Sequence, residues 1–205
     1  METKRRLFLV LIAAAAAALF FAASKPAHAG YIATMQQVGA DVVLDGSGAI
    51  DVTGLSVVPG TWSQGNGFVP SLGIVTLGTT AFTDIDLYSG ITGPASFGSG
   101  SEIDPNTGSG DHVRIQYNNG QGWFAVPRGY VSGTLLAGSD TFDNATFSSL
   151  GVTPGTYEWT WGTGVNQNFT LAIGTAAVPE PATWALLLAG LMAIFGLKPS
   201  RRKQI

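Results

Sequence analysis

The sequence predicts an all-β domain, an antiparallel β-sandwich or jelly roll, between two short apolar helices at the ends of the chain. Glycine supplies 26 of residues 30–178, and serine and threonine supply another 31. Such a composition disfavours helices and favours turns. Apolar and polar residues also alternate over short runs separated by Gly, Pro, Asn or Asp. These two observations are typical of sandwiches built from many short strands.

The clearest alternation occurs in residues 113–117, 157–161 and 169–173, where large apolar residues, mostly β-branched or aromatic, occupy every second position. One face of each run is therefore expected to be buried, so Tyr157, Trp159 and Trp161 are assigned to the core. Further strands are expected at residues 41–44, 50–57, 72–77, 85–88, 123–126, 130–136 and 141–147. Residues 118–122 predict a hairpin turn, and the polar stretch 98–110 is expected to be the least ordered part.

Residues 1–29 predict a secretory signal peptide. Basic residues at positions 4–6 precede an apolar run at 7–23, and Ala27 and Ala29 form the small-x-small pattern that signal peptidase accepts. Cleavage after Ala29 makes Gly30 the first residue of the mature chain, with the Sec translocon and signal peptidase as expected partners. The alternative is a retained anchor helix, because about 17 apolar residues span roughly 25 Å, near the lower limit for crossing a membrane.

Residues 178–205 predict a short membrane anchor. A transmembrane helix is expected at 182–197, where a span of about 24 Å can cross with local thinning of the bilayer. A basic cluster follows it, formed by Lys198, Arg201, Arg202 and Lys203. Because basic flanks stay in the cytoplasm, both ends of the precursor are expected there, with the exported β domain of residues 30–177 across the membrane.

The motif before this helix resembles the PEP-CTERM sorting signal of Gram-negative bacteria, in its PEP-x-x-W-A variant. The residues that carry the resemblance are Val178, Pro179, Glu180, Pro181 and Trp184. The resemblance implies an exosortase substrate, anchored in the inner membrane as a precursor, cleaved at or near the motif, and passed to the cell surface or the extracellular matrix. Proteins similar to this often occur in strains that make exopolysaccharide, so the resemblance also implies exopolysaccharide as a partner. Pro199 departs from the pattern by separating the helix from the basic cluster.

Charge is distributed very unevenly along the chain. Residues 30–178 contain eleven Asp and Glu against two Arg, a balance of −9, whereas the ends contain the other eight Lys and Arg. This excludes a nucleic-acid-binding domain, which needs a cationic face to neutralise phosphates.

The residue inventory argues against catalysis. The chain has no cysteine, and His112 is the only histidine outside the predicted signal peptide, so a thiol nucleophile and multi-histidine metal sites are excluded. His112 is expected to be solvated at the start of a strand. Asp84 and Asp86 share a strand face and are the candidate carboxylate pair of a glycan-active enzyme, but two surface acids are the simpler interpretation. We therefore expect no enzyme and assign no catalytic residue.

Two kinds of ligand site are predicted. Trp62 and Trp123 stand beside glycines in or near loops and are candidate carbohydrate contacts, since exposed indole rings stack on sugars. Asp104, Asn106 and Asp111 supply oxygen ligands in a glycine-rich stretch and form a candidate calcium site, with a flexible polar loop as the alternative. No other cofactor is expected.

The function predicted from sequence is a non-enzymatic exported surface or matrix protein, sorted through its C-terminal motif and associated with exopolysaccharide. The alternatives are a carbohydrate-binding module that uses exposed tryptophans and a glycan-active enzyme.

Overall fold

The computed structural model describes residues 30–174, which form an all-β sandwich of two packed sheets. The predicted signal helix and transmembrane helix lie outside the described residues. Within residues 30–174, no helix is long and apolar enough to cross a membrane. The all-β prediction is confirmed.

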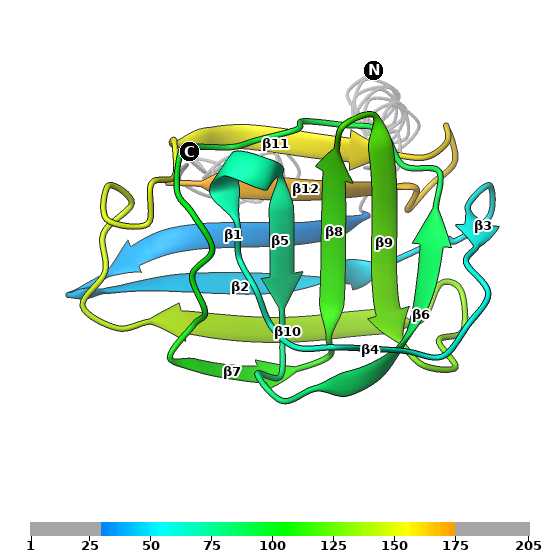
Figure 1. Ribbon diagram of the computed structural model, residues 1–205, viewed down its shortest axis with the longest axis horizontal. Helices are drawn as coiled ribbons and strands as arrows, with labels where there is room; N and C mark the ends of the chain where they lie inside the picture. The colour runs from blue at the N-terminus through cyan, green and yellow to red at the C-terminus, as the bar shows by residue number, and fades with distance from the viewer. Residues whose placement is uncertain (1–29, 175–205) are drawn as a thin grey trace, which may run out of the picture. The chain divides into compact units, whose positions relative to one another are not determined.

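Each sheet has six strands. The first sheet, in spatial order, contains β11 (Gly155–Thr160), β12 (Asn168–Ile173), β1 (Tyr31–Val38), β2 (Asp41–Ala49), β10 (Leu135–Phe142) and β7 (Thr107–Gly110). The second contains β3 (Ser56–Val57), β6 (Thr83–Ser89), β9 (Gln121–Pro127), β8 (Val113–Asn118) and β5 (Ile74–Leu77), with β4 (Trp62–Gln64) also paired to β6. A single 3-10 turn, η1 (Pro70–Leu72), leads into β5. The strands β5, β8 and β9 lie across the long strands of the first sheet and cross them steeply (Figure 1).

The expectation of a wholly antiparallel arrangement is wrong for one pair of strands. Strand β1 pairs antiparallel with β2 but parallel with β12, from Tyr31 opposite Phe169 to Met35 opposite Ile173. Alternation of apolar and polar residues encodes which face of a strand is buried, not the direction of its neighbour. The first strand therefore sits inside the sheet, paired on both sides.

The core lies between the two sheets and is rich in aromatic rings. Trp159 and Phe169 are fully buried, with ring centroids 5.8 Å apart in an edge-to-face arrangement. The indole N–H of Trp159 donates to the Pro94 carbonyl at 3.1 Å, and that of Trp161 donates to the Asp51 carbonyl at 2.7 Å. The assignment of these two tryptophans to the core is confirmed, and Tyr157 packs against it half-buried.

Several predicted strands have different limits. Of residues 50–57, only Ser56–Val57 is a strand, and of residues 130–136, only the last two belong to β10. Residues 130–134 form a turn instead, which Tyr130 holds in place. Its hydroxyl donates to the Thr134 carbonyl at 2.7 Å and accepts from the Ile50 amide at 3.1 Å. These side-chain hydrogen bonds take the place of the backbone hydrogen bonds between paired strands. The alternation of apolar and polar residues does not reveal this difference.

Three strands were not predicted: β1, β7 and the short β4. Strand β1 alternates in burial, but its inward face carries Ala33 and Met35, so this face lacks the β-branched residues that mark a core strand. Strand β7 falls in the stretch expected to be least ordered, because its Thr-Gly-Ser-Gly sequence has no apolar face and is held by pairing with β10. The hairpin between β8 and β9 is confirmed, with Asn119 and Gly120 at φ 51° and 74°, as a two-residue type I′ turn requires.

Candidate functional site

A hollow on the outer face of the second sheet brings together side chains from three neighbouring strands. Val113, Ile115 and Phe124 point into the core, so the residues that alternate with them point outward. In this register Ala125 of β9 lies between Leu87 of β6 and Arg114 of β8.

Trp123 of β9 lies on the same outer face, opposite Gln116 of β8. The floor of the hollow is therefore a strip of apolar side chains on β6 and β9 with an arginine and a glutamine beside it on β8.

The wall of the hollow is the segment that leads into β4. Trp62 stands opposite Ile85 of β6 and is 40 % exposed. Its indole N–H donates to the Val58 carbonyl at 3.3 Å. The ring also lies over Gly60, where an added Cβ would come within 3.0 Å of the indole nitrogen and where φ is +139°. A glycine at this position thus allows the chain to turn tightly beneath the ring and hold it in place.

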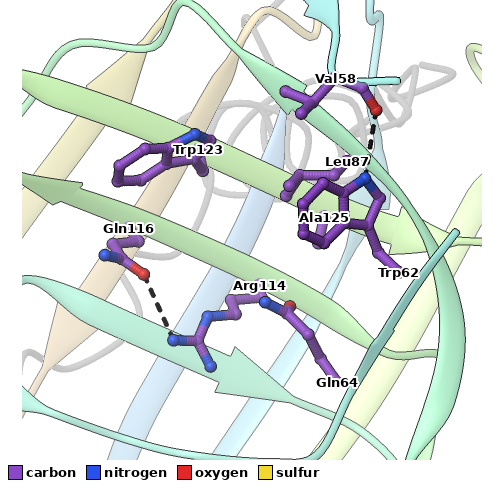
Figure 2. Close-up of a pocket in the computed structure, with 8 residues that line it drawn as sticks. All are labelled: Val58, Trp62, Gln64, Leu87, Arg114, Gln116, Trp123 and Ala125. Atoms are coloured by element: carbon purple, nitrogen blue, oxygen red, sulfur yellow. Dashed lines mark hydrogen bonds between the residues drawn. The ribbon is translucent and has the colours of Figure 1, made fainter. Parts of the chain in front are cut away.

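The hollow has a volume of about 310 Å³ and is lined by both tryptophans that the sequence singled out. Figure 2 shows Trp123 and Trp62 on either side of Leu87 and Ala125, with Arg114 running alongside between Gln116 and Gln64. The two indoles come from distant parts of the chain, and the pairing of β4 and β9 with β6 brings them into one site.

Arg114 is the one charged side chain that lines the hollow. Its guanidinium donates to Gln116 Oε1 at 3.3 Å and to Thr76 Oγ1 at 3.5 Å. Burial lowers the pKa of Arg114 from its ordinary value, and the negative charge of Glu102 opposes that change. Among residues 30–174 the single ion pair joins Arg128 to Asp84 at 3.2 Å on the exposed surface, so no carboxylate oxygen of the described chain lies within 4.0 Å of Arg114.

This arrangement suits binding better than reaction. Two indole faces and two amide side chains can hold an amphipathic ring through stacking and hydrogen bonds. The lining contains neither a carboxylate nor a histidine that could act as a general acid or base.

The predicted calcium ligands are not brought together. Residues 107–110 form the extended strand β7, so Asn106 and Asp111 stand at its two ends, roughly 16 Å apart along the strand. Asn106 Oδ1 accepts from the Asp143 amide at 2.8 Å, and Asp111 Oδ2 accepts from the Ala137 amide at 2.9 Å. Asp104 lies exposed near the start of this segment. Among the described residues, no group of three or more His, Cys, Asp or Glu could hold a metal ion.

The residues considered for catalysis are also separated from the hollow. Asp84 pairs with Arg128, and Asp86 Oδ2 accepts from the Gly129 amide at 2.8 Å. His112 was expected to be solvated, but it is only 2 % exposed. Burial and the nearby charge of Arg114 lower the pKa of His112 to about 4, although the Thr79 backbone opposes the shift. The imidazole is therefore neutral at pH 7.

Sequence reasoning missed a buried carboxyl group between the sheets. Asp140 of β10 is 1 % exposed, and its two oxygens accept from the Asn66 side-chain amide at 3.1 and 3.0 Å. One oxygen also accepts from the Gly78 amide at 3.3 Å. Burial raises the pKa of Asp140 to about 7, and these hydrogen bonds partly offset that effect. In the sequence Asp140 stands between Ser139 and Thr141, and these polar neighbours do not indicate that its carboxyl group is buried.

The remaining predicted sites are at the chain ends. The expected cleavage residues Ala27 and Ala29, the motif residues Val178 to Pro181, Trp184 and the basic cluster all lie outside the described residues. Gly30, the expected first residue of the mature chain, is buried directly before β1, where an added Cβ would collide with the Asn168 carbonyl.

Comparison with known proteins identifies one region of the chain. No curated protein and no solved structure matches the chain. The family model of the PEP-CTERM protein-sorting motif matches residues 177–202, the same region that contains Pro179, Glu180 and Pro181. The chain therefore carries a PEP-CTERM protein-sorting motif at its C-terminus, which implies an exosortase substrate, exported and sorted to the cell surface.

Proposed function

We propose that this protein is a non-enzymatic surface or matrix protein whose β-sandwich binds a saccharide chain in the hollow between Trp62 and Trp123. The observation that carries the proposal is that both indoles line one hollow. The proposed route is signal-peptide cleavage after Ala29, temporary anchoring in the inner membrane through the helix at 182–197, and exosortase cleavage near the PEP motif.

The chemistry of the hollow supports a sugar as ligand. A pyranose ring has an apolar face that stacks on an indole and hydroxyl groups around its edge. Gln64, Gln116 and Arg114 supply donors and acceptors next to the rings. The volume of about 310 Å³ lies at the lower end of the range for small-molecule sites, so the hollow fits a short segment of a longer chain.

The cell's own exopolysaccharide is the proposed ligand, because the sorting route delivers the domain to the surface where this polymer accumulates. The charge of −9 over residues 30–178 keeps such a domain soluble there. No hydrolysis is proposed, because the lining of the hollow lacks an acidic side chain.

Binding is tested by titrating the full-length chain, kept in mild detergent, with oligosaccharides from the host polymer and recording tryptophan fluorescence. Trp62→Ala and Trp123→Ala should each weaken binding about tenfold, since one aromatic stack contributes roughly 1 kcal/mol or more. Phe82→Ala is the matched control, because Phe82 is an aromatic side chain that is 80 % exposed and does not line this hollow. Equal affinities in all three variants would refute the site.

Sorting is tested by measuring the intact mass of the protein in membrane, surface and medium fractions. A mass from Gly30 to about Pro181 outside the membrane is expected for the wild type. A Glu180→Ala chain should stay in the membrane fraction with its C-terminus intact. A wild-type mass that always extends to Ile205 would refute cleavage at the motif.

A further inference from the structure

We propose that Arg114 is an anion subsite of the hollow and selects a sugar that carries a carboxylate, that is, a uronic acid residue. This inference rests on the proposed saccharide-binding function and adds the chemical class of the ligand. It follows from the position of one guanidinium group between two hollows of the surface.

The side chain of Arg114 is half-buried, and its guanidinium donates long hydrogen bonds to uncharged side chains. Its hydrogen bonds to Gln116 and Thr76, at 3.3 and 3.5 Å, are long for a charged donor, which usually reaches oxygen at 2.7 to 2.9 Å. Neither partner carries a negative charge. Glu102 acts on this cation from a distance, and no carboxylate oxygen of the described residues lies within 4.0 Å of it. A half-buried cation without a directly paired carboxylate is costly in a folded protein, and binding a planar carboxylate would offset that cost through the paired N–H groups of the fork.

The placement of Arg114 suits a sugar stacked on the indoles. Arg114 lies opposite Ala125, and Trp123 is two residues from Ala125 on the same face of β9. Such diagonal neighbours lie about 7 to 8 Å apart at their Cα atoms, which is within reach of a long side chain. A ring that stacks on Trp123 would therefore present a carboxylate on its edge to the guanidinium.

A second hollow, of about 520 Å³, adjoins the first and shares Arg114 and Gln64 with it. Glu102 lines this second hollow. A Cβ at Gly67 would lie 3.2 Å from Glu102 Oε1 and 3.8 Å from one Arg114 nitrogen, so the acid and the guanidinium both lie next to Gly67 without forming an ion pair. Glu102 is thus the internal competitor for the site that a ligand carboxylate would occupy.

The acidic domain as a whole repels anions, so the subsite must act locally. Arg114 and Arg128 are the two cations of residues 30–178. Arg128 is already paired with Asp84 on the exposed surface and does not line the hollow. Replacing either arginine changes the net charge equally, which separates a local contact from a long-range effect of charge.

The experiment uses a galacturonic acid trimer and its methyl ester, which share linkage and ring shape but differ in charge. Binding to the full-length chain in detergent is measured by calorimetry at fixed ionic strength. The wild type should bind the acid at least tenfold more tightly than the ester. Arg114→Gln should remove this preference, and Arg128→Gln should keep it.

Glu102→Gln gives a second, independent measurement. Removing the competing carboxylate should tighten binding of the acid and leave the ester unaffected. A wild type without preference, a preference that survives Arg114→Gln, or equal losses in the two arginine variants would overturn the anion subsite. If the ester binds in a Trp62-dependent manner without preference for the acid, only this inference fails. If neither trimer binds and Trp62→Ala changes nothing with polymer from the host, the proposed function fails as well.

Discussion

The stability of the sandwich should depend on pH through two buried groups that act in opposite directions. Asp140 has a pKa of about 7 in the folded protein against 3.8 as its ordinary value, so the folded state holds this proton more tightly. Its contribution to stability is fully present below about pH 4 and is lost as the pH rises to 7. His112 has a pKa of about 4 against 6.5, so its contribution is present above pH 6.5 and is lost as the pH falls to 4.

The two effects are of similar size. Each unit of pKa difference corresponds to about 1.4 kcal/mol. Asp140, shifted from 3.8 to about 7, gives about 3 kcal/mol in favour of the folded state on going from pH 7 to pH 4. His112, shifted from 6.5 to about 4, gives about 3 kcal/mol against it. These two contributions should therefore nearly cancel in the wild type.

Single variants should remove this compensation. Asp140→Asn, which keeps the shape of the side chain, should lose about 3 kcal/mol relative to the wild type on acidification from pH 7 to pH 4. His112→Leu should gain about 3 kcal/mol relative to the wild type over the same range. Comparison at each pH cancels the other carboxylates, which all chains share.

The assay is urea unfolding followed by tryptophan fluorescence at half-unit steps between pH 4 and pH 8, with linear extrapolation to water. The double variant is the control, because it lacks both groups and should follow the wild type in its pH dependence. If the profiles of both single variants run parallel to that of the wild type, the titration of Asp140 and His112 does not govern stability and the reasoning is refuted.

Two further substitutions test the packing of the sandwich. Gly108→Ala should destabilise the domain by about 2 kcal/mol or more, because an added Cβ would collide with the Asp140 carboxylate and the Gly78 carbonyl; Gly39→Ala, with open space and φ +64°, should cost only about 1 kcal/mol. Equal melting temperatures for the two alanine variants would contradict this. Tyr130→Phe should cost about 1 to 3 kcal/mol, because it leaves the Ile50 amide without its hydroxyl acceptor. Urea unfolding measures this loss, and an unchanged midpoint would show that the turn is held by other contacts.

Much of the strand pattern could be predicted because local alternation reflects burial directly. The runs ending at Trp161 and Ile173 are core strands with the expected face inward. A strand was predicted wrongly where side-chain hydrogen bonds replaced strand pairing, as at Tyr130. Strand β7 was missed because its pairing with β10, and not an apolar face, holds it in the sheet. The parallel pairing of β1 with β12 joins the two ends of the domain, and no local pattern encodes it.

The candidate site could be predicted only as separate residues. Trp62 and Trp123 were selected because each stands beside glycines, and the structure places them in one hollow. Arg114 and Gln116 were recognised as the polar half of a strand, but their role depends on which side chains of β9 lie opposite them. The three proposed calcium ligands looked contiguous in sequence, yet an extended strand holds Asn106 and Asp111 apart.

The sorting motif and the composition of an all-β domain can be recognised in the amino-acid sequence alone. A sorting motif is read by an enzyme as a short linear segment, and hydrophobic alternation is a local property, so both are visible in the chain. The hollow that Trp62 and Trp123 share beside Arg114, and the burial of Asp140 and His112, exist only in the folded protein. Those facts depend on the register of strands far apart in sequence, because the burial and charge environment of a side chain are set by what packs against it.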